Sequence, residues 1–564
     1  NLSALFLTSM VVSVAYGQTS IQGVVKDGSS MTSIPGVTVS IKGKPASTKT
    51  DATGKFQINA SPTDSLVFNF LGYRSQTVYI GSQTQLSVFL ENENQALEEV
   101  VVIGYGTQKK ADLTGSISSL KSADITKQPA MSAMQSIQGK AAGLNIVANE
   151  APGSSPNVII RGLGTALGGR NPLYIVDGIA QTDINNINPS DIESMDVLKD
   201  ASSASIYGLR AANGVIMVTT KKGKTGTTSI NYESYAGIKT VLNRVKMANG
   251  EQFRTYFNEN LKSLGVTNWS LSPNQPNDTD WYDEMLRTGS VFNNAVNISG
   301  GSENVDYFVS ANNFTENGIL DGSKYVRNTV RNNNVYKFLN NRLKFTQNLN
   351  LTLTNATPKP YSAFTTAYKQ SPLVPTMYEN GRYGIGRVNQ NTGIVGIDGT
   401  AGQTIGNLNT IGNPIYEVLR QNDRTNTLRL QGNIEGEFKI TDYLKINSRI
   451  GGNKFYSKQR VFTNVKDRWL NANPLRSEAD FYNDKASRPG NTDYADNSLK
   501  YENLEQFRWS WENFLTFNKS FDKHNVEAVV GMSREKFDIN SLNSQMGYNV
   551  PAQEQYWNIN LANG

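Results

Sequence analysis

The 564-residue sequence contains no cysteine and a single histidine, His524. The missing thiols exclude a disulfide framework, a cysteine nucleophile and a thiolate metal site. One imidazole cannot form a pair of histidine metal ligands, and no set of nucleophile, base and orienting residue can be assembled from the remaining side chains. We therefore predict no metal site, no cofactor, no catalytic residues and no enzymatic activity.

A strong charge of one sign is also missing. The net charge is +6, and lysines and arginines form no block, so nothing predicts binding to nucleic acid. Long apolar runs are absent apart from Leu5 to Val14, which precede the small residues Ala15-Tyr16-Gly17. This pattern is typical of a signal peptide over residues 1–17, with a buried helix as the alternative. Because a membrane-spanning helix needs about 20 apolar residues, a membrane location would require a β-barrel.

Tyrosine, phenylalanine and glycine are abundant, with 25, 22 and 48 residues, which favours strands over helices. Residues 18–92 contain short strand-like runs separated by clusters of Gly, Pro, Asp and Ser. The runs are IQGVVKD, GVTVSIKG, GKFQINA, DSLVFNFLG and QLSVFL. Strands at this spacing predict a small Ig-like β-sandwich.

Residues 93–110 include ALEEVVVIGYGTQKK, in which an acidic pair precedes Val100, Val101, Val102 and Ile103. The segment is either a linker, the last strand of the preceding domain, or a strand without a sheet. An unpaired apolar strand is an aggregation hazard, unless it adds to the sheet edge of another protein. We predict this last alternative for Glu99 to Ile103.

Residues 111–225 have a mixed α/β pattern. The run MSAMQSIQGKAAGL predicts a helix that ends at Gly143, and NVIIRG, LYIVDGI and VIMVTT predict short strands. Asp200 is expected to cap a short helix that Gly208 ends. The glycines from Gly162 to Gly169 lack the G-x-G-x-x-G spacing and a following helix, which indicates tight turns and not a nucleotide-binding loop.

Residues 226–564 alternate strictly between apolar and polar side chains. In TLRLQGNIEGEFKI, one face carries Leu428, Leu430, Ile434, Phe438 and Ile440. About nine such segments occur, many at or above the length of about 9–11 residues that a membrane-crossing strand needs. Long and short connections alternate, which is typical of an outer-membrane barrel; a large secreted β-sandwich or solenoid is the alternative. Since an odd number of strands cannot close an antiparallel barrel, we expect further strands beyond Gly564.

Several loop residues have open roles. Asp278, Asp280 and Asp423 could bind Ca²⁺, although solvated carboxylates are more common. Trp281, Tyr282 and Trp557 could contact a ligand or belong to an interface or an aromatic girdle. The sequence does not identify ligand-binding residues.

Taken together, these segments resemble the SusC/RagA-type TonB-dependent outer-membrane transporters. The resemblance rests on ALEEVVVIGYGTQKK, NVIIRGLGT, NPLYIVDGI and NPSDIESMDVLKDASSASIYGLRAANGVIMVTTKKG. It implies a carboxypeptidase regulatory-like domain (18–92), a TonB box at Glu99, Val100, Val101, Val102 and Ile103, a plug (111–225) and the first part of an antiparallel transmembrane barrel (226–564) of about 22 strands when complete. The structural motif residues of the plug would be Arg161, Gly162, Asp177, Gly178, Asp200, Tyr207, Gly208, Arg210 and Gly214.

The resemblance also implies a location and partners. The barrel would lie in the outer membrane of a Gram-negative bacterium, with the N-terminal domain and the TonB box in the periplasm. Partners would be TonB with ExbB and ExbD, a SusD-like surface lipoprotein, outer-membrane lipid, and an oligosaccharide or peptide to be imported. A siderophore or vitamin receptor that also signals, and a secreted β-rich adhesin, are the alternatives.

Overall fold

The computed structural model describes residues 19–28, 31–70, 72–91, 100–103, 106–109, 117–128, 130–162, 169–200, 205–397, 404–522, 524–551 and 553–562. Its contacts divide the chain into two units, Asn1–Val100 with Lys109–Asp112, and Val101–Gln108 with Leu113–Gly564. Among the described residues, no helix combines the length and the apolar character needed to cross a membrane.

The N-terminal domain is a β-sandwich, as the sequence predicts. One sheet has the order β4-β1-β7 and the other β3-β2-β5-β6. Alternate residues of each strand are buried, and those of both sheets meet in one hydrophobic core that includes Val25, Val39 and Phe68. The strands are β1 (Thr19–Asp27), β2 (Thr38–Ile41), β3 (Ser47–Lys49), β4 (Lys55–Ala60), β5 (Ser65–Asn69), β6 (Gln76–Tyr79) and β7 (Gln85–Leu90).

The plug contains a five-stranded sheet of order β10-β15-β16-β13-β14 and a β11-β12 hairpin. β13 and β16 are parallel and buried almost throughout, as a central sheet position requires. The strands are β10 (Ile117–Lys121), β11 (Leu144–Val147), β12 (Asn157–Ile160), β13 (Leu173–Val176), β14 (Ile179–Gln181), β15 (Ile192–Leu198) and β16 (Val215–Thr220). The helical segments are α1 (Ser122–Ile125), α2 (Ala133–Ser136), η2 (Pro189–Asp191) and η3 (Ser205–Ala211).

One helix prediction in the plug is wrong in extent, and a second falls partly outside the described residues. The helix expected to reach Gly143 ends at Ser136, because Gly139 already has a positive φ of 74° and the chain continues in turns. Residues 201–204, where the short helix after Asp200 would begin, lie outside the described residues, so capping by Asp200 stays a prediction. In the described part, η3 is a 3-10 segment with a break in helical conformation at Gly208, where φ is 65°.

In the described part of the chain, nine antiparallel strands pair in the order β17-β18-β19-β20-β21-β25-β26-β27-β28. We call them the large sheet. Its polar and apolar faces alternate residue by residue as predicted: Asn433 is buried while Ile434 is 54% exposed. The strands are β17 (Gly226–Lys239), β18 (Gly289–Gly301), β19 (Val305–Asn317), β20 (Lys324–Phe338), β21 (Leu343–Thr357), β25 (Asn422–Thr441), β26 (Leu444–Thr463), β27 (Ser498–Phe521) and β28 (His524–Tyr548).

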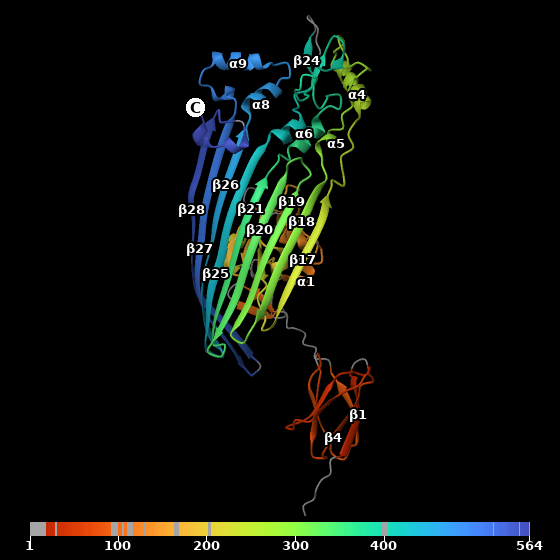
Figure 1. The fold of residues 1–564 in the computed structure, drawn as a ribbon, viewed down its shortest axis with the longest axis vertical. Coiled ribbons are helices and arrows are strands. Elements are labelled where there is room, and N and C mark those ends of the chain that lie inside the picture. The colour runs from red at the N-terminus through yellow and green to blue at the C-terminus, as the bar shows by residue number, and fades with distance from the viewer. Residues whose placement is uncertain are drawn as a thin grey trace, which may run out of the picture. The chain divides into compact units, whose positions relative to one another are not determined.

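The connections of the large sheet alternate in length, as predicted. Short turns join β18 to β19, β20 to β21, β25 to β26 and β27 to β28, and positive φ values at Asn340, Asn341 and Asp522 allow two of these reversals. Long loops gather at the other end of the strands (Figure 1). They contain α4 (Gly250–Ser263), α5 (Trp281–Met285), α6 (Ala363–Lys369), β22 (Arg387–Asn389), β23 (Ile394–Val395), β24 (Ile405–Asn407), α7 (Pro414–Arg420), α8 (Val465–Asn471), α9 (Glu478–Ser487) and η4 (Thr492–Tyr494), and η5 (Glu554–Tyr556) and η6 (Ile559–Leu561) follow β28.

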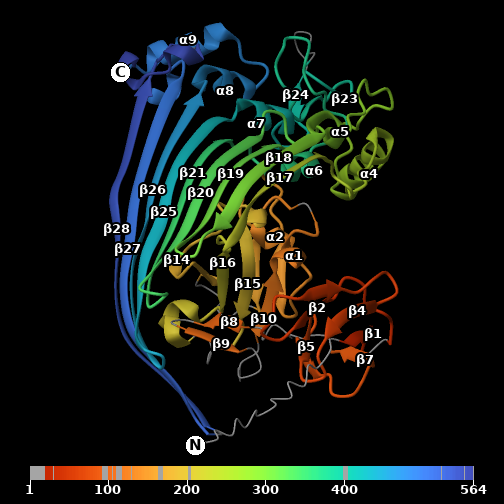
Figure 2. The same ribbon diagram turned by 60° about the horizontal axis from the view of Figure 1, so that its bottom comes forward.

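The large sheet is curved, and the plug lies on its concave side (Figure 2). The concave face is the polar face, since Asn433 on β25 and Arg331 on β20 reach plug residues. The exposed convex face is apolar and includes Leu430 and Ile450. This arrangement brings polar side chains of the sheet against the plug.

Candidate functional site

The contact between the plug and the concave face centres on the turn after β13. Asp177 (φ 48°) and Gly178 (φ 88°) both have left-handed backbone conformations. The Asp177 carboxylate accepts hydrogen bonds from the backbone N–H (3.0 Å) and the hydroxyl (2.7 Å) of Thr220, at the end of β16. Its carbonyl oxygen accepts one from Asn433 Nδ2 (2.6 Å) on β25. The turn is therefore tied to the plug sheet by its side chain and to the large sheet by its backbone.

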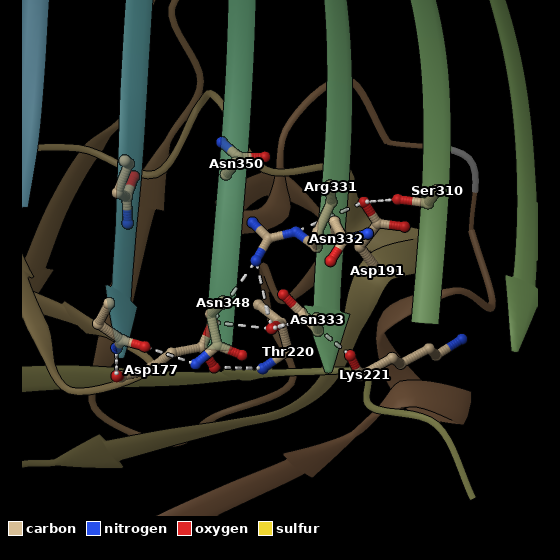
Figure 3. A network of polar contacts seen from close by, with 12 residues as sticks. Asp177, Asp191, Thr220, Lys221, Ser310, Arg331, Asn332, Asn333, Asn348 and Asn350 are labelled. Atoms are coloured by element: carbon tan, nitrogen blue, oxygen red, sulfur yellow. Dashed lines mark hydrogen bonds and ion pairs between the residues drawn. The ribbon is translucent and has the colours of Figure 1, made fainter. Parts of the chain in front are cut away.

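Arg331, on β20, reaches between two plug carboxylates (Figure 3). Its Nη1 lies 3.5 Å from Asp177 Oδ2 and donates to Thr220 Oγ1 at 3.2 Å. Its Nε lies 3.8 Å from Asp191 Oδ2. The Arg331 side chain is only 2% exposed, so its charge is balanced by these carboxylates and not by water.

Asp191, in η2, is the most buried acid of this network, at 1% exposure. Its Oδ2 accepts a hydrogen bond from Ser310 Oγ (2.9 Å) on β19. Burial raises the pKa of the Asp191 carboxyl, and the positive charge of Arg331 opposes that shift. Two strands of the large sheet thus hold a single plug carboxylate.

Asn333, two residues after Arg331 on the same face of β20, belongs to the same network. Its Nδ2 donates to Thr220 Oγ1 (2.9 Å) and to the carbonyl oxygen of Lys221 (2.8 Å). Within the described residues, however, Arg331 Nη2, Asp191 Oδ1 and Asn333 Oδ1 have no hydrogen-bond partner.

A second set of contacts lies further along the plug. Arg429 on β25 makes two hydrogen bonds to the Asp183 carboxylate, at 3.1 and 3.3 Å. Asn186 Nδ2 donates to Gln431 Oε1 (3.2 Å) on the same strand. Charged side chains from β20 and β25 therefore hold two separate parts of the plug.

Close approach at Gly178 depends on the absence of a side chain. A Cβ at Gly178 would overlap the guanidinium of Arg449, on β26. Arg449 is itself held on the concave face by Glu435 (2.7 Å) and Glu512 (3.3 Å). The glycine lets the plug turn sit directly against an ordered cationic group.

The structure distributes the motif residues predicted from the sequence over several roles. Arg161 forms an ion pair with Asp200 inside the plug, and the Tyr207 hydroxyl lies 3.7 Å from the sulfur of Met217. Arg210 instead reaches the large sheet, with Nη1 2.6 Å from Glu535 Oε2.

The glycines of the motifs occupy turns. Gly162 and Gly214 have φ values of 95° and 89°. A Cβ at Gly214 would lie 2.8 Å from Ile160 Cδ1, whereas no atom of the described residues lies within 4 Å of one at Gly162. Their roles are thus conformational at Gly162, and both conformational and steric at Gly214.

Sequence reasoning missed the centre of the network, namely Asp191, Thr220, Ser310, Arg331 and Asn333. Asp191 and Thr220 stand in the quoted motifs. Ser310, Arg331 and Asn333 lie on the polar face of alternating strands, but that pattern does not distinguish a residue that meets the plug from one that meets water.

The predicted partner-binding segment forms strand β8 (Val100–Ile103), paired with β9 (Gly106–Lys109) in a two-stranded sheet. Glu99 lies outside the described residues. A two-stranded sheet leaves one edge of each strand unpaired by the sheet itself. Binding of another protein to Val100, Val101, Val102 and Ile103 stays a prediction.

The loop residues with open roles contribute to local structure. Trp281 is 4% exposed, and its Nε1 donates to the carbonyl oxygen of Ser371 at 2.9 Å. The Asp280 carboxylate caps α5. Trp557 stacks on Phe462, with ring centroids 4.0 Å apart. No group of three or more potential metal-ligating side chains occurs in the part of the chain that the structure describes.

Comparison with known proteins gives two family matches. The TonB-dependent Receptor Plug Domain matches residues 109–215, and the CarboxypepD_reg-like domain matches residues 21–102. TonB-dependent receptor SusC of Bacteroides thetaiotaomicron is 30% identical over 567 residues, which cover 96% of this chain and 52% of SusC. The chain belongs to the SusC/RagA-type TonB-dependent receptors.

Two further similarities support membership of this family. TonB-dependent receptor P3 of Formosa agariphila is 31% identical over 544 residues, covering 95% of this chain and 50% of that receptor. The RagAB peptide importer in its open-open state has the same fold, with a TM-score of 0.62 and 21% identity over 82% of this chain and 52% of the RagAB chain. The chain spans about half the length of the curated relatives it matches.

Membership of this family confirms the predicted fold class of a carboxypeptidase regulatory-like sandwich, a plug and part of a barrel sheet. The large sheet corresponds to part of the barrel wall of this family, so the buried network described above is the contact between the plug and the barrel wall.

Proposed function

We propose that the full-length protein is an energy-coupled importer that carries a large nutrient across the outer membrane. The observation that carries this proposal is the buried ionic contact between the plug and the large sheet, centred on Arg331, Asp177 and Asp191. Such a contact holds the plug in place through non-covalent interactions, which a pulling force can separate.

In this proposal TonB, energised through ExbB and ExbD, binds Glu99, Val100, Val101, Val102 and Ile103 in the periplasm. The free edge that a two-stranded sheet offers supports a strand-addition contact, in which main-chain hydrogen bonds provide the grip. Pulling on this segment would be transmitted to the plug, whose β10 begins at Ile117. Arg331, Asn333 and Arg429 would be the contacts of the barrel wall that yield.

The apolar convex face supports a barrel embedded in outer-membrane lipid, with the polar concave face around the plug. The ligand would be an oligosaccharide or a peptide, and a SusD-like surface lipoprotein would cover the loop end of the barrel. Family membership and the fold shared with the RagAB peptide importer support this assignment. They do not choose between the two ligand classes.

Strand addition by TonB is tested with Val101→Pro in the full-length protein. Proline removes a backbone N–H and is poorly tolerated within a paired strand, so we expect uptake to be lost while ligand binding to whole cells is retained. Val101→Ala, which keeps the backbone donor, is the matched control and should import normally. Deletion of residues 99–103 should reproduce the proline result. Undiminished uptake in the proline and deletion variants would exclude this segment as the coupling site.

A further inference from the structure

Four cationic side chains lie on the convex face of β25 and β26, in the half of the strands toward the loop end. In the register of the sheet, Arg424 pairs with Arg460, and Arg460 pairs with Tyr501. Because side chains alternate between faces, Lys454, Lys458 and Arg460 share one face of β26. Residues of the opposite face, such as Arg429, reach the plug. The four cations therefore point away from the plug.

Lys458, Arg460 and Arg424 lie just beyond the apolar rows of the convex face, whereas Lys454 pairs with Leu430 inside them. On β25, the exposed apolar residues Ile434, Leu430 and Leu428 precede Arg424 toward the loop end. On β27, the largely apolar side chains of the convex face extend from Phe517 to Phe507, a span of about ten residues. At about 3.3 Å per residue and a tilt of about 40°, this span rises about 25 Å, which is the height of the apolar band of an outer-membrane barrel. Lys458, Arg460 and Arg424 would thus lie at the level of the lipid headgroups, and the long side chain of Lys454 starts at the edge of the apolar band.

The positive charges exceed the carboxylates that accompany them. Arg424 and Arg460 share one carboxylate, that of Glu554, at 2.5 and 2.8 Å. Lys454 forms an ion pair with Glu505. Lys458 has no ion pair among the described residues, and its Nζ lies 5.2 Å from the ring centroid of Tyr501. The cluster thus contains four cations and two anions.

The same height on neighbouring strands is nearly uncharged. The row of paired residues at the loop ends of β18, β19, β20 and β21 contains Ser290, Asn317, Lys324 and Thr357. In this row, one cation on four strands contrasts with two adjacent cations, Arg424 and Arg460, on β25 and β26, and Lys458 follows at the next position of the same face. From β18 to β26, the positive charge at the loop end of the convex face is therefore concentrated on β25 and β26.

We propose that Arg424, Lys454, Lys458 and Arg460 bind the phosphate groups of an anionic glycolipid in the outer leaflet. This inference rests on the proposed placement of the protein in the outer membrane. Guanidinium groups bind phosphate oxygens in a bidentate manner and lysine supplies a mobile point charge, while Tyr501 provides the amphipathic ring that suits this depth. The site binds lipid from the outside of the barrel and is separate from the plug contact.

The test is lipid binding by full-length protein in an uncharged detergent, with diphosphorylated lipid A as the probe. Lys458→Asn/Arg460→Gln should raise the apparent Kd at least about tenfold, and added salt should weaken wild-type binding more than binding by the double variant. Lys519→Asn is the matched control and should bind as wild type. Lys519 also lies over an aromatic ring, at 4.6 Å from Tyr443, but near the short-turn end of the sheet.

Equal binding by wild type and the double variant would overturn the proposal. So would an equal loss in Lys519→Asn, or equally tight binding of phosphatidylethanolamine, because either result would indicate general charge or lipid affinity. Heat-modifiable gel migration reports folding of each variant. If Val101→Pro lost uptake but bound lipid A normally, the result would concern energy coupling and not the lipid site. Absence of the wild-type protein from the outer-membrane fraction would refute the membrane placement on which both proposals depend.

Discussion

Arg331 is the side chain on which the plug contact most depends. It carries a buried positive charge from β20 to within 3.5 Å of Asp177 and 3.8 Å of Asp191. If it were removed, both carboxylates would be left without the cation that compensates their burial, and an uncompensated buried charge destabilises far more than a lost surface ion pair.

Arg331→Met should therefore loosen the plug. We expect the free energy that holds the plug in the barrel to fall by about 3–5 kcal/mol. The measurement is protease protection of the plug in outer-membrane vesicles, together with influx of a large antibiotic into cells.

A double variant in which both charges are removed refines this prediction. Asp191→Asn/Arg331→Met removes both charges and should recover part of the protection. Lys344→Met is the control, because Lys344 pairs in register with Glu437 on the same face and makes no hydrogen bond to the plug among the described residues. Full protection in Arg331→Met would contradict the role assigned to this residue.

At the scale of the element, the turn between β13 and β14 combines two constraints at adjacent positions. Asp177 holds the turn to β16, and Gly178 lets it approach Arg449. The sequence motif containing these residues predicts a turn. It does not predict that a guanidinium of the large sheet fills the space beside the glycine.

Substitution of Gly178 separates backbone strain from steric exclusion. Gly178→Ala and Gly162→Ala both place a side chain at a positive φ, of 88° and 95°, which costs about 1–2 kcal/mol. Only at Gly178 would the methyl group also meet Arg449. We expect Gly178→Ala to lose protease protection of the plug and uptake, and Gly162→Ala to retain most of both. Equal effects would mean that the close approach to Arg449 is unimportant.

At the scale of the whole molecule, the proposed import would require the plug to separate from the barrel wall. The 564 residues contain no cysteine, so paired cysteines can be introduced without competing thiols in this part of the protein. Asp191 Oδ2 and Ser310 Oγ are 2.9 Å apart and belong to the plug and to β19. A disulfide at Asp191→Cys/Ser310→Cys would join the two parts covalently.

Oxidation of this double variant should abolish uptake, and reduction should restore it to the level of the single variants. The matched control is Ser155→Cys/Asn185→Cys, which replaces a 2.8 Å side-chain hydrogen bond within the plug and should not impair uptake when oxidised. Normal uptake by the oxidised plug-to-wall variant, with the cross-link shown by mass spectrometry, would contradict plug separation at this contact.

Local sequence patterns determined much of the secondary structure of this protein. Along residues 226–564, apolar and polar residues alternate with a period of two, which specifies strands. Because alternate side chains of a strand face opposite sides, this pattern separates Leu430 and Ile434 from Gln431 and Asn433. Turn residues and spacing likewise predict the N-terminal sandwich. The helix expected up to Gly143 is the exception, since a positive φ at Gly139 ends the regular structure earlier.

Only the tertiary structure decided which polar residues form the candidate site. Asp177 and Arg331 are 154 positions apart, and Arg331 has the same place in the alternating pattern as polar residues that contact no plug group. Their partnership depends on the curvature of the large sheet and on the position of the plug within it. The sequence by itself determined which face would be polar, whereas the meeting of two distant surfaces determined which of those polar groups became buried charges.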